Sequence, residues 1–275
     1  MAEPKKKKIV DADSGKEVKA GSRKKKAAAP VGNATGFRVG AIALWVVALA
    51  FEVLAYLVLI GKVNLNFIPS MAQMIAFLVL DLICVIAGSA LWKKANHIKP
   101  ASKKNKTLFW LWNNMGLIVC IVCFFPFVVL ALLNKETDKK TKTIATIVAV
   151  IALLIGGACS IDYNPVSAEE QQAAMEAIST DVYWSPFGKV YHTHDDCSSL
   201  NQTDTLTVGD VEQAIAANRT RLCSYCARRD EITGVTTDGK DVSDVEFEDV
   251  EEEYEEEVLE EDVETEEDLE EDVEE

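Results

Sequence analysis

The sequence lacks the short motifs that mark the common classes of enzyme. It has no P-loop, no G-x-G-x-x-G turn, no recognisable Ser/His/Asp set and no paired acidic residues on an expected catalytic loop. Such motifs hold phosphates or activate a nucleophile, so nothing in the chain supports NTP hydrolysis, dinucleotide-dependent redox chemistry or serine hydrolysis. We therefore expect a protein that is not an enzyme.

Basic residues are absent from residues 241–275, which hold 23 of the 44 acidic residues. The net charge of −16 is misleading for this reason, because the rest of the chain has 28 basic and 21 acidic residues, a net charge of +7. The N-terminal region is basic instead, with clusters at Lys5–Lys8 and Arg23–Lys26. Segments so rich in charge bury too little apolar surface to offset the entropy cost of ordering. We expect disordered tails, a basic one over 1–38 and an acidic one over 231–275.

Charged residues are also scarce in four long segments between these tails. The apolar segments are 39–61, 69–92, 107–133 and 143–161. Each reaches or approaches the ~20 residues that a helix needs to cross a hydrocarbon core of ~30 Å. The first is too long for a cleaved signal peptide and follows too extended a charged region. The pattern predicts an α-helical membrane protein with four transmembrane helices over 39–161.

Lysine and arginine residues predict the orientation, because short cytoplasmic loops are enriched in them. Eleven lie in the N-terminal tail and six in the loop 93–106, which predicts that both are cytoplasmic and that the protein lies in the cell membrane. The loop 134–142 has four lysines and would lie outside. Either four full spans place the C-terminal part in the cytoplasm, or a re-entrant hairpin over 107–133, broken near Asn113–Asn114 or Pro126, places it outside. Re-entrant backbone must be shielded from lipid, so we favour four spans.

Four polar residues interrupt the apolar segments: Glu52, Asp81, Asn113 and Asn114. An ionisable residue within a span is costly and marks a candidate functional site, in this case a proton or cation path. The alternative is hydrogen bonding between helices, which would only hold the bundle together. No basic residue or histidine lies at that depth to pair with the acidic residues. Four spans without internal repeats are also few for a transporter. We favour the structural role.

One histidine and three cysteines follow the last span in a pattern typical of zinc sites. His192 and Cys197 are separated from the C-x-x-C pair Cys223 and Cys226 by a stretch long enough for one helix. Zn²⁺ takes nitrogen and thiolate ligands in a tetrahedral arrangement, and this spacing fits a closed structural site. A disulfide between two cysteines is the alternative, disfavoured by a reducing cytoplasmic location. His194 is the alternative to His192, which ends a predicted strand.

The residues around these ligands predict a small α+β zinc-binding module over 181–230, raised on a stalk over 162–180. The expected elements are a β-hairpin over 182–193, a helix over 211–217 and the Cys223/Cys226 zinc knuckle. A unit of this size with few large apolar residues needs a cross-link to fold, and a bound zinc ion can supply it.

The module also resembles a known family. The run V-Y-W-S-P-F-G-K-V-Y-H with a cysteine five residues on, followed by a helix and R-L-C-x-x-C, is similar in layout to the zinc-binding domain of Ada-type DNA-repair proteins. The resemblance covers about 182–229, and the membrane part looks like that of bacterial multi-pass proteins bearing this module. It implies metal-ligand roles for four residues: His192, Cys197, Cys223 and Cys226. Ada-type domains use four cysteines and methylate one of them, so a histidine at the first position removes the thiolate that this reaction needs.

We expect a multi-pass membrane protein that presents a zinc-binding module for interaction or sensing at the membrane. One alternative is ion or metal transport through Glu52 and Asp81, and a second is a membrane-tethered module that contacts nucleic acid through nearby arginines. The expected partners are the lipid bilayer and a protein bound by the module or by the acidic tail. Nucleic acid is disfavoured, because the acidic tail would compete with phosphate for those arginines.

Overall fold

The computed structural model describes residues 7–19, 21, 32–66 and 68–239. The expectation of a disordered acidic tail therefore falls, from residue 240 onward, outside the described residues, as does much of the basic tail.

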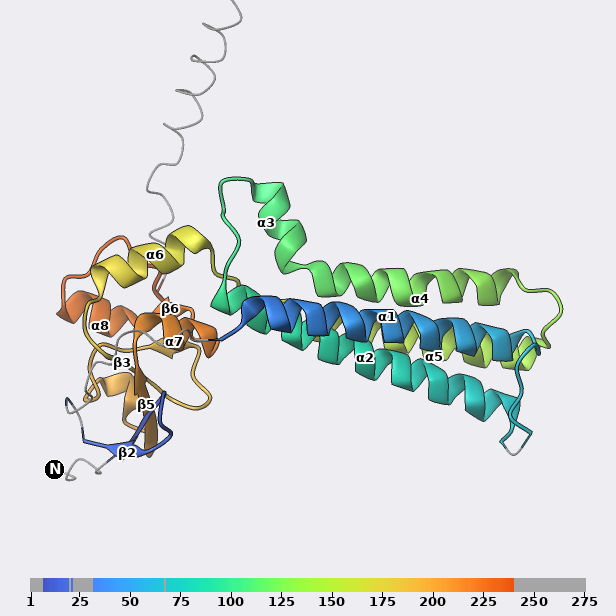
Figure 1. The fold of residues 1–275 in the computed structure, drawn as a ribbon, viewed down its shortest axis with the longest axis horizontal. Coiled ribbons are helices and arrows are strands. Elements are labelled where there is room, and N and C mark those ends of the chain that lie inside the picture. Colours follow the sequence, from blue (N-terminus) through green and yellow to red (C-terminus); the bar gives the residue numbers. More distant parts are fainter. Residues whose placement is uncertain (1–6, 20, 22–31, 67, 240–275) are drawn as a thin grey trace, which may run out of the picture. The chain divides into compact units, whose positions relative to one another are not determined.

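Four long apolar helices dominate the first part of the chain (Figure 1). They are α1 (Ala34–Leu59), α2 (Ser70–Ile98), α4 (Met115–Leu133) and α5 (Lys139–Ser160). All four are long and apolar enough to cross a membrane. The shortest, α4, has 19 residues and is therefore about 28 Å long. Side chains fix two of the starts, since Asn33 accepts a hydrogen bond from the Gly36 N–H and Asp138 accepts one from the Thr141 N–H.

The helices pack through small residues and expose large apolar ones. Ala41, Ala48 and Ala55 recur every seven residues on the buried face of α1. By contrast, large apolar side chains such as Val46, Ile83 and Leu154 point outward. Close packing by small residues with an apolar exterior is the arrangement expected in lipid, where burial of apolar surface does not drive helices together.

The predicted span 107–133 is two helices rather than one. The short helix α3 (Lys106–Asn113) ends where Asn113 and Asn114 hydrogen-bond through their side chains to the carbonyls of Phe109 and Trp110, and α4 begins at once. Figure 1 shows α3 turned away from the line of α4. The break lies at Asn113–Asn114, whereas Pro126 lies inside the continuous helix α4. The continuity of α4 excludes a hairpin broken at Pro126, and the break at Asn113–Asn114 separates α3 from a helix that is itself long enough to cross a membrane.

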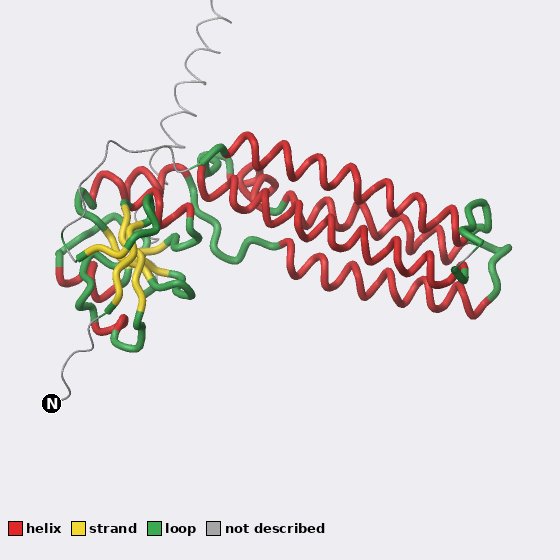
Figure 2. Tube along the Cα trace, turned by 60° about the horizontal axis from the view of Figure 1, so that its bottom comes forward, coloured by secondary structure: helices red, strands yellow, loops and turns green. Residues whose placement is uncertain are grey.

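The second part of the chain is a small α+β module. It contains α6 (Ala168–Ala177), β3 (Val182–Trp184), β4 (Val190–Tyr191), the 3-10 turn η1 (Ser198–Leu200), β5 (Thr205–Gly209), α7 (Val211–Ala216), β6 (Arg221–Leu222) and α8 (Ser224–Arg229). The strands are drawn in yellow in Figure 2. The predicted hairpin is present as one antiparallel pair, Tyr183 with His192, while β4 pairs in parallel with β6. The stalk expected over 162–180 contains α6, which opens with the predicted capping box of Ser167 and Glu170.

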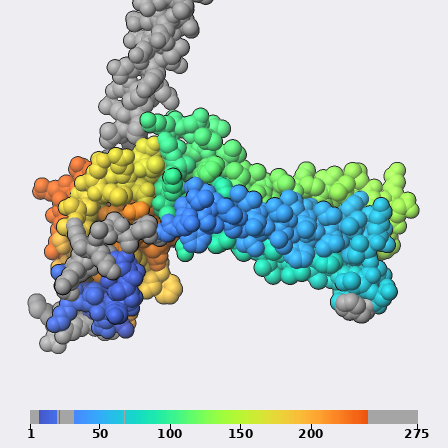
Figure 3. Space-filling model, viewed as in Figure 1, coloured from blue at the N-terminus to red at the C-terminus, as the bar shows by residue number. Residues whose placement is uncertain are grey.

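The module is larger than the sequence predicts, because both of its neighbouring tails contribute to it. Strands β1 (Lys8–Asp11) and β2 (Glu17–Val18) extend its sheet in the order β2-β1-β5-β3. Figure 3 shows the dark blue atoms of this N-terminal segment beside the orange atoms of the module. At the other end, the Leu222 N–H donates to the carbonyl of Thr236, and Val235 lies in the core. The expectation of disorder is therefore wrong for residues 8–11, 17–18 and 231–239, and also for residues 34–38, which belong to α1. Pairing with a distant strand stabilises segments that could not fold alone.

This sheet fixes which ends of the chain share a side of the bundle. Strand β1 precedes the four long helices and pairs in parallel with β5, which follows them. Near the same end, the His97 ring lies 2.9 Å from the Asp162 carboxylate, and the Ala168 N–H donates to the Ala101 carbonyl. If the four helices span a membrane, the residues before the first and after the fourth lie on one side of it.

Candidate metal centre

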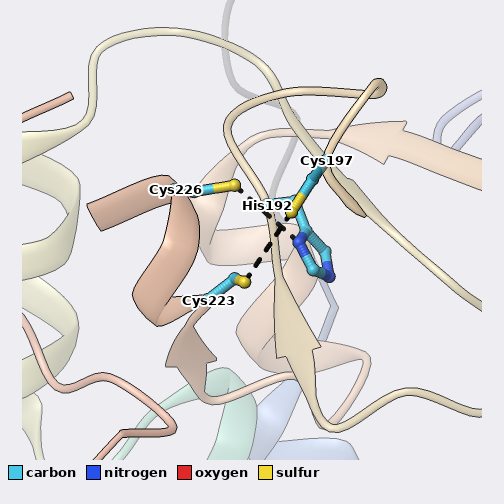
Figure 4. Close-up of side chains that lie close together, drawn as sticks. All are labelled: His192, Cys197, Cys223 and Cys226. Carbon is cyan, nitrogen blue, oxygen red and sulfur yellow. Dashed lines mark hydrogen bonds between the residues drawn. The ribbon is translucent and has the colours of Figure 1, made fainter. Parts of the chain in front are cut away.

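The candidate centre brings together four side chains from separate parts of the module (Figure 4). His192 follows β4, Cys197 precedes the η1 turn, and Cys223 and Cys226 lie at the start of α8. All four are buried, with at most 5% of any residue exposed. Their ligand atoms lie within 4.8 Å of one another, so the group could hold a metal ion.

The spacing of these atoms matches the edges of a metal-centred tetrahedron. Cys197 Sγ lies 3.9 Å from Cys223 Sγ, and Cys226 Sγ lies 3.8 Å from His192 Nδ1. A tetrahedron with metal–sulfur bonds of about 2.3 Å has edges of about 3.8 Å. A disulfide would need about 2.0 Å between sulfurs, and all three cysteines are free thiols, so the disulfide alternative does not describe this cluster.

The two neighbouring histidines have different partners. The His192 ring is buried and turns Nδ1 toward the three sulfurs, whereas His194 lies outside the group and pairs through Nε2 with the Asp230 carboxylate at 2.6 Å. Burial acts to raise the pKa of Asp230, but hydrogen bonds from Thr193 and His194 outweigh it and leave that pKa below its usual value. Of the two, His192 is the one placed to bind a metal.

Backbone hydrogen bonds hold the ligands in place. His192 exchanges two bonds of 2.7 Å with Tyr183, and the Cys223 N–H donates to the carbonyl of Tyr191 at 2.9 Å. Tyr191 is among the largest fully buried side chains of the protein. The ligand positions are thus set by the sheet and by α8, and binding a metal would need little rearrangement of them.

The thiols of the C-x-x-C pair influence each other's protonation. The hydrogen bond from Cys226 lowers the pKa of Cys223 although burial opposes it, and the same contact raises the pKa of Cys226. One thiolate is therefore stabilised by its neighbour. Thiolate is the form that binds a metal, so the cluster is suited to a cation that displaces the remaining protons.

The loop between His192 and Cys197 is attached to α8 and to the N-terminal arm. Asp196 pairs with Arg229 at 2.7 Å, and the Asp195 carbonyl accepts a hydrogen bond from the Lys7 side chain. Neither carboxylate belongs to the metal group. The Lys7 contact could not be found by sequence motif, because the lysine belongs to the N-terminal arm that precedes all four long helices.

The four polar residues expected within the membrane do not form one site. Glu52 and Asp81 are both buried and close enough for their charges to interact. Asn113 and Asn114 lie instead at the break before α4, where the Asn113 side-chain oxygen accepts a weak 3.4 Å hydrogen bond from Asn96. Only the two acidic residues remain as a candidate intramembrane pair.

Comparison with known protein families, with curated proteins and with solved structures gives no match for this chain. The arguments for its function therefore rest on its own residues and geometry.

Proposed function

We propose that this chain is a multi-pass membrane protein whose module binds one zinc ion in a closed structural site. The observation that carries the proposal is the buried Cys₃His cluster, with its donor atoms 3.8 to 3.9 Å apart along two measured edges. Three thiolates and an imidazole suit a borderline-soft, tetrahedral cation such as Zn²⁺ better than Mg²⁺ or Ca²⁺, which prefer oxygen.

The role proposed for the metal is to hold the module together rather than to catalyse a reaction. Four protein ligands complete a tetrahedral site and leave no position for a reactive water. The hollow beside Cys197 and Cys226 has a volume of about 130 Å³. That is below the roughly 300 Å³ at which small-molecule sites begin. The metal would join the β4 end, the η1 loop and α8.

We propose that the module presents a surface for a protein partner at the membrane. Phe187, in the turn between β3 and β4, is 98% exposed, and Tyr225 on α8 is also exposed. Tyrosine and phenylalanine are both enriched in the cores of protein interfaces. The Ada-like layout remains part of the proposal only as a metal-binding arrangement, since His192 stands where methyl transfer would need a thiolate.

The proposed orientation places the module and the N-terminal arm in the cytoplasm. The end of the bundle that adjoins the module includes the six lysines of residues 93–106. The positive-inside rule assigns such an end to the cytoplasm, where thiols stay reduced and available to a metal.

Transport through the bundle is a second candidate function, favoured by one observation. Asp81 is fully buried, and neither of its carboxylate oxygens has a hydrogen-bond partner among the described residues. A buried, unsatisfied carboxyl group near Glu52 suits a proton or cation path. The test is an Asp81→Asn variant: loss of an ion-dependent phenotype at normal protein levels supports transport, and an unchanged phenotype contradicts it.

Nucleic-acid binding has weaker support, because some of the arginines that would bind phosphate have partners within the module. Of the arginines near the knuckle, Arg219 donates to the carbonyls of Ser185 and Pro186, and Arg229 pairs with Asp196. These two cations are engaged within the module, which leaves a small basic patch for phosphate.

Zinc content of the purified full-length protein tests the main proposal. We expect about one zinc per chain by elemental analysis, and loss of the module's protease resistance when a chelator removes the metal. The full chain is needed because β1 completes the sheet. Cys223→Ser should lose the zinc, whereas Cys159→Ser, at an exposed position near the end of α5, should keep it. A protein that is folded, protease-resistant and free of metal would refute the proposal.

A further inference from the structure

A basic cavity lies where α1, α3 and the loop before α3 meet. Its volume is about 450 Å³. The lining residues that matter here are Arg38, Lys99, Lys104, Asn105, Leu108 and Trp112. None of them belongs to the metal-binding module, so this cavity is a separate feature of the helical part.

Three cations border the cavity without a direct acidic partner. Arg38, Lys99 and Lys104 form no ion pair with a carboxylate among the residues that the structure describes. The nearest acidic influence is Glu169, whose charge interacts with Lys104. Its carboxylate accepts hydrogen bonds from the Ser102 hydroxyl and the Lys103 N–H, and its single negative charge offsets only one of the three cations. The cavity therefore retains an excess of positive charge.

The Arg38 side chain is held in place by its neighbours, but one of its hydrogen-bond donors has no acceptor among the described residues. Its guanidinium carbon lies 5.2 Å from the Trp112 ring centre and 5.9 Å from that of Trp92, and Nη2 donates to the Lys99 carbonyl at 2.8 Å. Its Nε is buried and has no acceptor within the described part of the chain. Native proteins rarely leave a buried donor unpaired, so an unpaired one calls for an explanation such as a ligand.

If α1 and α2 span a membrane, the cavity lies near the depth of the lipid headgroups, because it lies at the ends of these helices. Arg38 is in the second turn of α1, and Lys99 follows the last residue of α2. Beside them, α3 exposes Leu108 and Trp110, each by more than half of its surface. Tryptophan beside basic residues at the ends of spans is typical of the membrane–water interface.

We propose that this cavity binds the phosphate group of an anionic phospholipid. The guanidinium of Arg38 and the ammonium groups of Lys99 and Lys104 would hold the phosphate, since basic pockets between transmembrane helices recognise anionic headgroups. The apolar side chains of Leu108 and Trp112 would contact the glycerol and the first acyl carbons. These apolar walls favour a lipid over a free anion, because a free anion has no apolar group to contact them.

Lipid titration of the delipidated full-length protein, followed by native mass spectrometry, tests this proposal. We expect phosphatidylglycerol to bind more tightly than phosphatidylcholine, and inorganic phosphate to bind far more weakly than phosphatidylglycerol. The double variant Lys99→Gln/Lys104→Gln should lose about fivefold in phosphatidylglycerol affinity for each charge removed, which corresponds to about 1 kcal/mol per lysine. Both lysines are exposed, so the double variant should fold.

The matched control is Lys139→Gln/Lys140→Gln, which removes two exposed charges at the start of α5 and should leave the affinity unchanged. Equal affinities for the two lipids would overturn the proposal, as would an unchanged affinity in the Lys99/Lys104 variant or the same loss in the control. Phosphate binding as tight as phosphatidylglycerol binding would show a free-anion site and would overturn it too.

Discussion

Ile9 pairs with Leu206, although the two residues are 197 positions apart in the chain. Ile9 lies on β1, before the four long helices, and Leu206 lies on β5, after them. Both side chains are buried in one core. The pair joins a segment before the first long helix and a segment after the fourth into one sheet, and it constrains both the topology and the stability of the module.

The first prediction concerns topology. If the helices span a membrane, reporters fused at the N-terminus and after residue 239 should be active on the same side, because β1 and β5 share a sheet. Reporters that are active only on one side of the membrane measure this directly. We expect that side to be the cytoplasm, by the distribution of lysine and arginine. Reporters active on opposite sides would contradict the sheet as well as the four-span arrangement.

The second prediction concerns the stability of the module. Ile9→Ala removes a side chain that is 6% exposed, and it should destabilise the module by about 2 kcal/mol, near the low end for such truncations because β1 lies close to the edge of the sheet. The measurement is the protease susceptibility of the module in the full-length protein as a function of denaturant.

Glu17→Ala is the control for this variant. Glu17 lies on β2 and pairs with Lys8 at 3.8 Å, with both side chains more than half exposed. An exposed pair contributes little, so the change should stay within about 0.5 kcal/mol. Equal effects of the two variants would mean that β1 is not packed against the core.

Sequence patterns could predict the long helices and the cluster of His192 with three cysteines, because both depend on local or chemically specific signals. Apolar runs mark the candidate spans, and the four clustered residues lie at spacings that few other sites require. The strand Lys8–Asp11 could not be predicted, because its composition is that of a basic tail and its partner β5 is distant in sequence. The Arg38 cavity could not be predicted for the same reason, because its lining comes from α1, from α3 and from the loop before α3.

The third prediction distinguishes His192, in the candidate metal centre, from the neighbouring His194. His192→Ala should lose zinc and leave the module open to proteolysis, because it removes one of four ligands. His194→Ala should retain the metal, because the His194 ring pairs with Asp230 outside the group. Elemental analysis of the purified variants gives the answer.

His192→Cys serves as a rescue control for the same experiment. A fourth thiolate completes another common zinc ligand set, so this variant should keep about one zinc per chain. Zinc retained by His192→Ala but lost from His194→Ala would reverse the assignment of the two residues.

The fourth prediction concerns pH and the contact between Asp162 and His97. Burial acts to raise the pKa of Asp162, but the hydrogen bond and charge of His97, with smaller effects of the Asn164 N–H and Lys93, leave that pKa below its usual value. A carboxyl group with a lowered native pKa stabilises the fold above its unfolded pKa of about 4, and this contribution is lost as the pH falls through the native value.

Asp162→Asn should therefore lower stability by about 1–3 kcal/mol at pH 7, because it removes a buried charged partner of His97. The gap between the variant and the unchanged protein should narrow toward pH 3, which thermal unfolding in detergent can measure. Glu176→Gln, at an exposed position on α6, is the control and should show no gap at either pH. A gap that stays constant with pH would show that the charge of Asp162 is not involved.

The fifth prediction concerns the contact between α1 and α2. A Cβ added at Gly88 would lie 2.5 Å from Trp45 Nε1 and 3.1 Å from the Ala41 carbonyl oxygen. Trp45 is buried and packs against Trp92 with ring centres 5.4 Å apart, so it has little room to move. Gly88→Ala should therefore destabilise the helical bundle by about 1–3 kcal/mol.

Gly157→Ala is the matched control on α5, because its added Cβ would meet only Leu117 Cδ1 at 3.4 Å. That variant should be neutral or more stable, by up to about 1 kcal/mol, since alanine favours helix over glycine. Thermal unfolding in detergent compares the two, and equal effects would mean that α1 and α2 do not approach each other closely at Gly88.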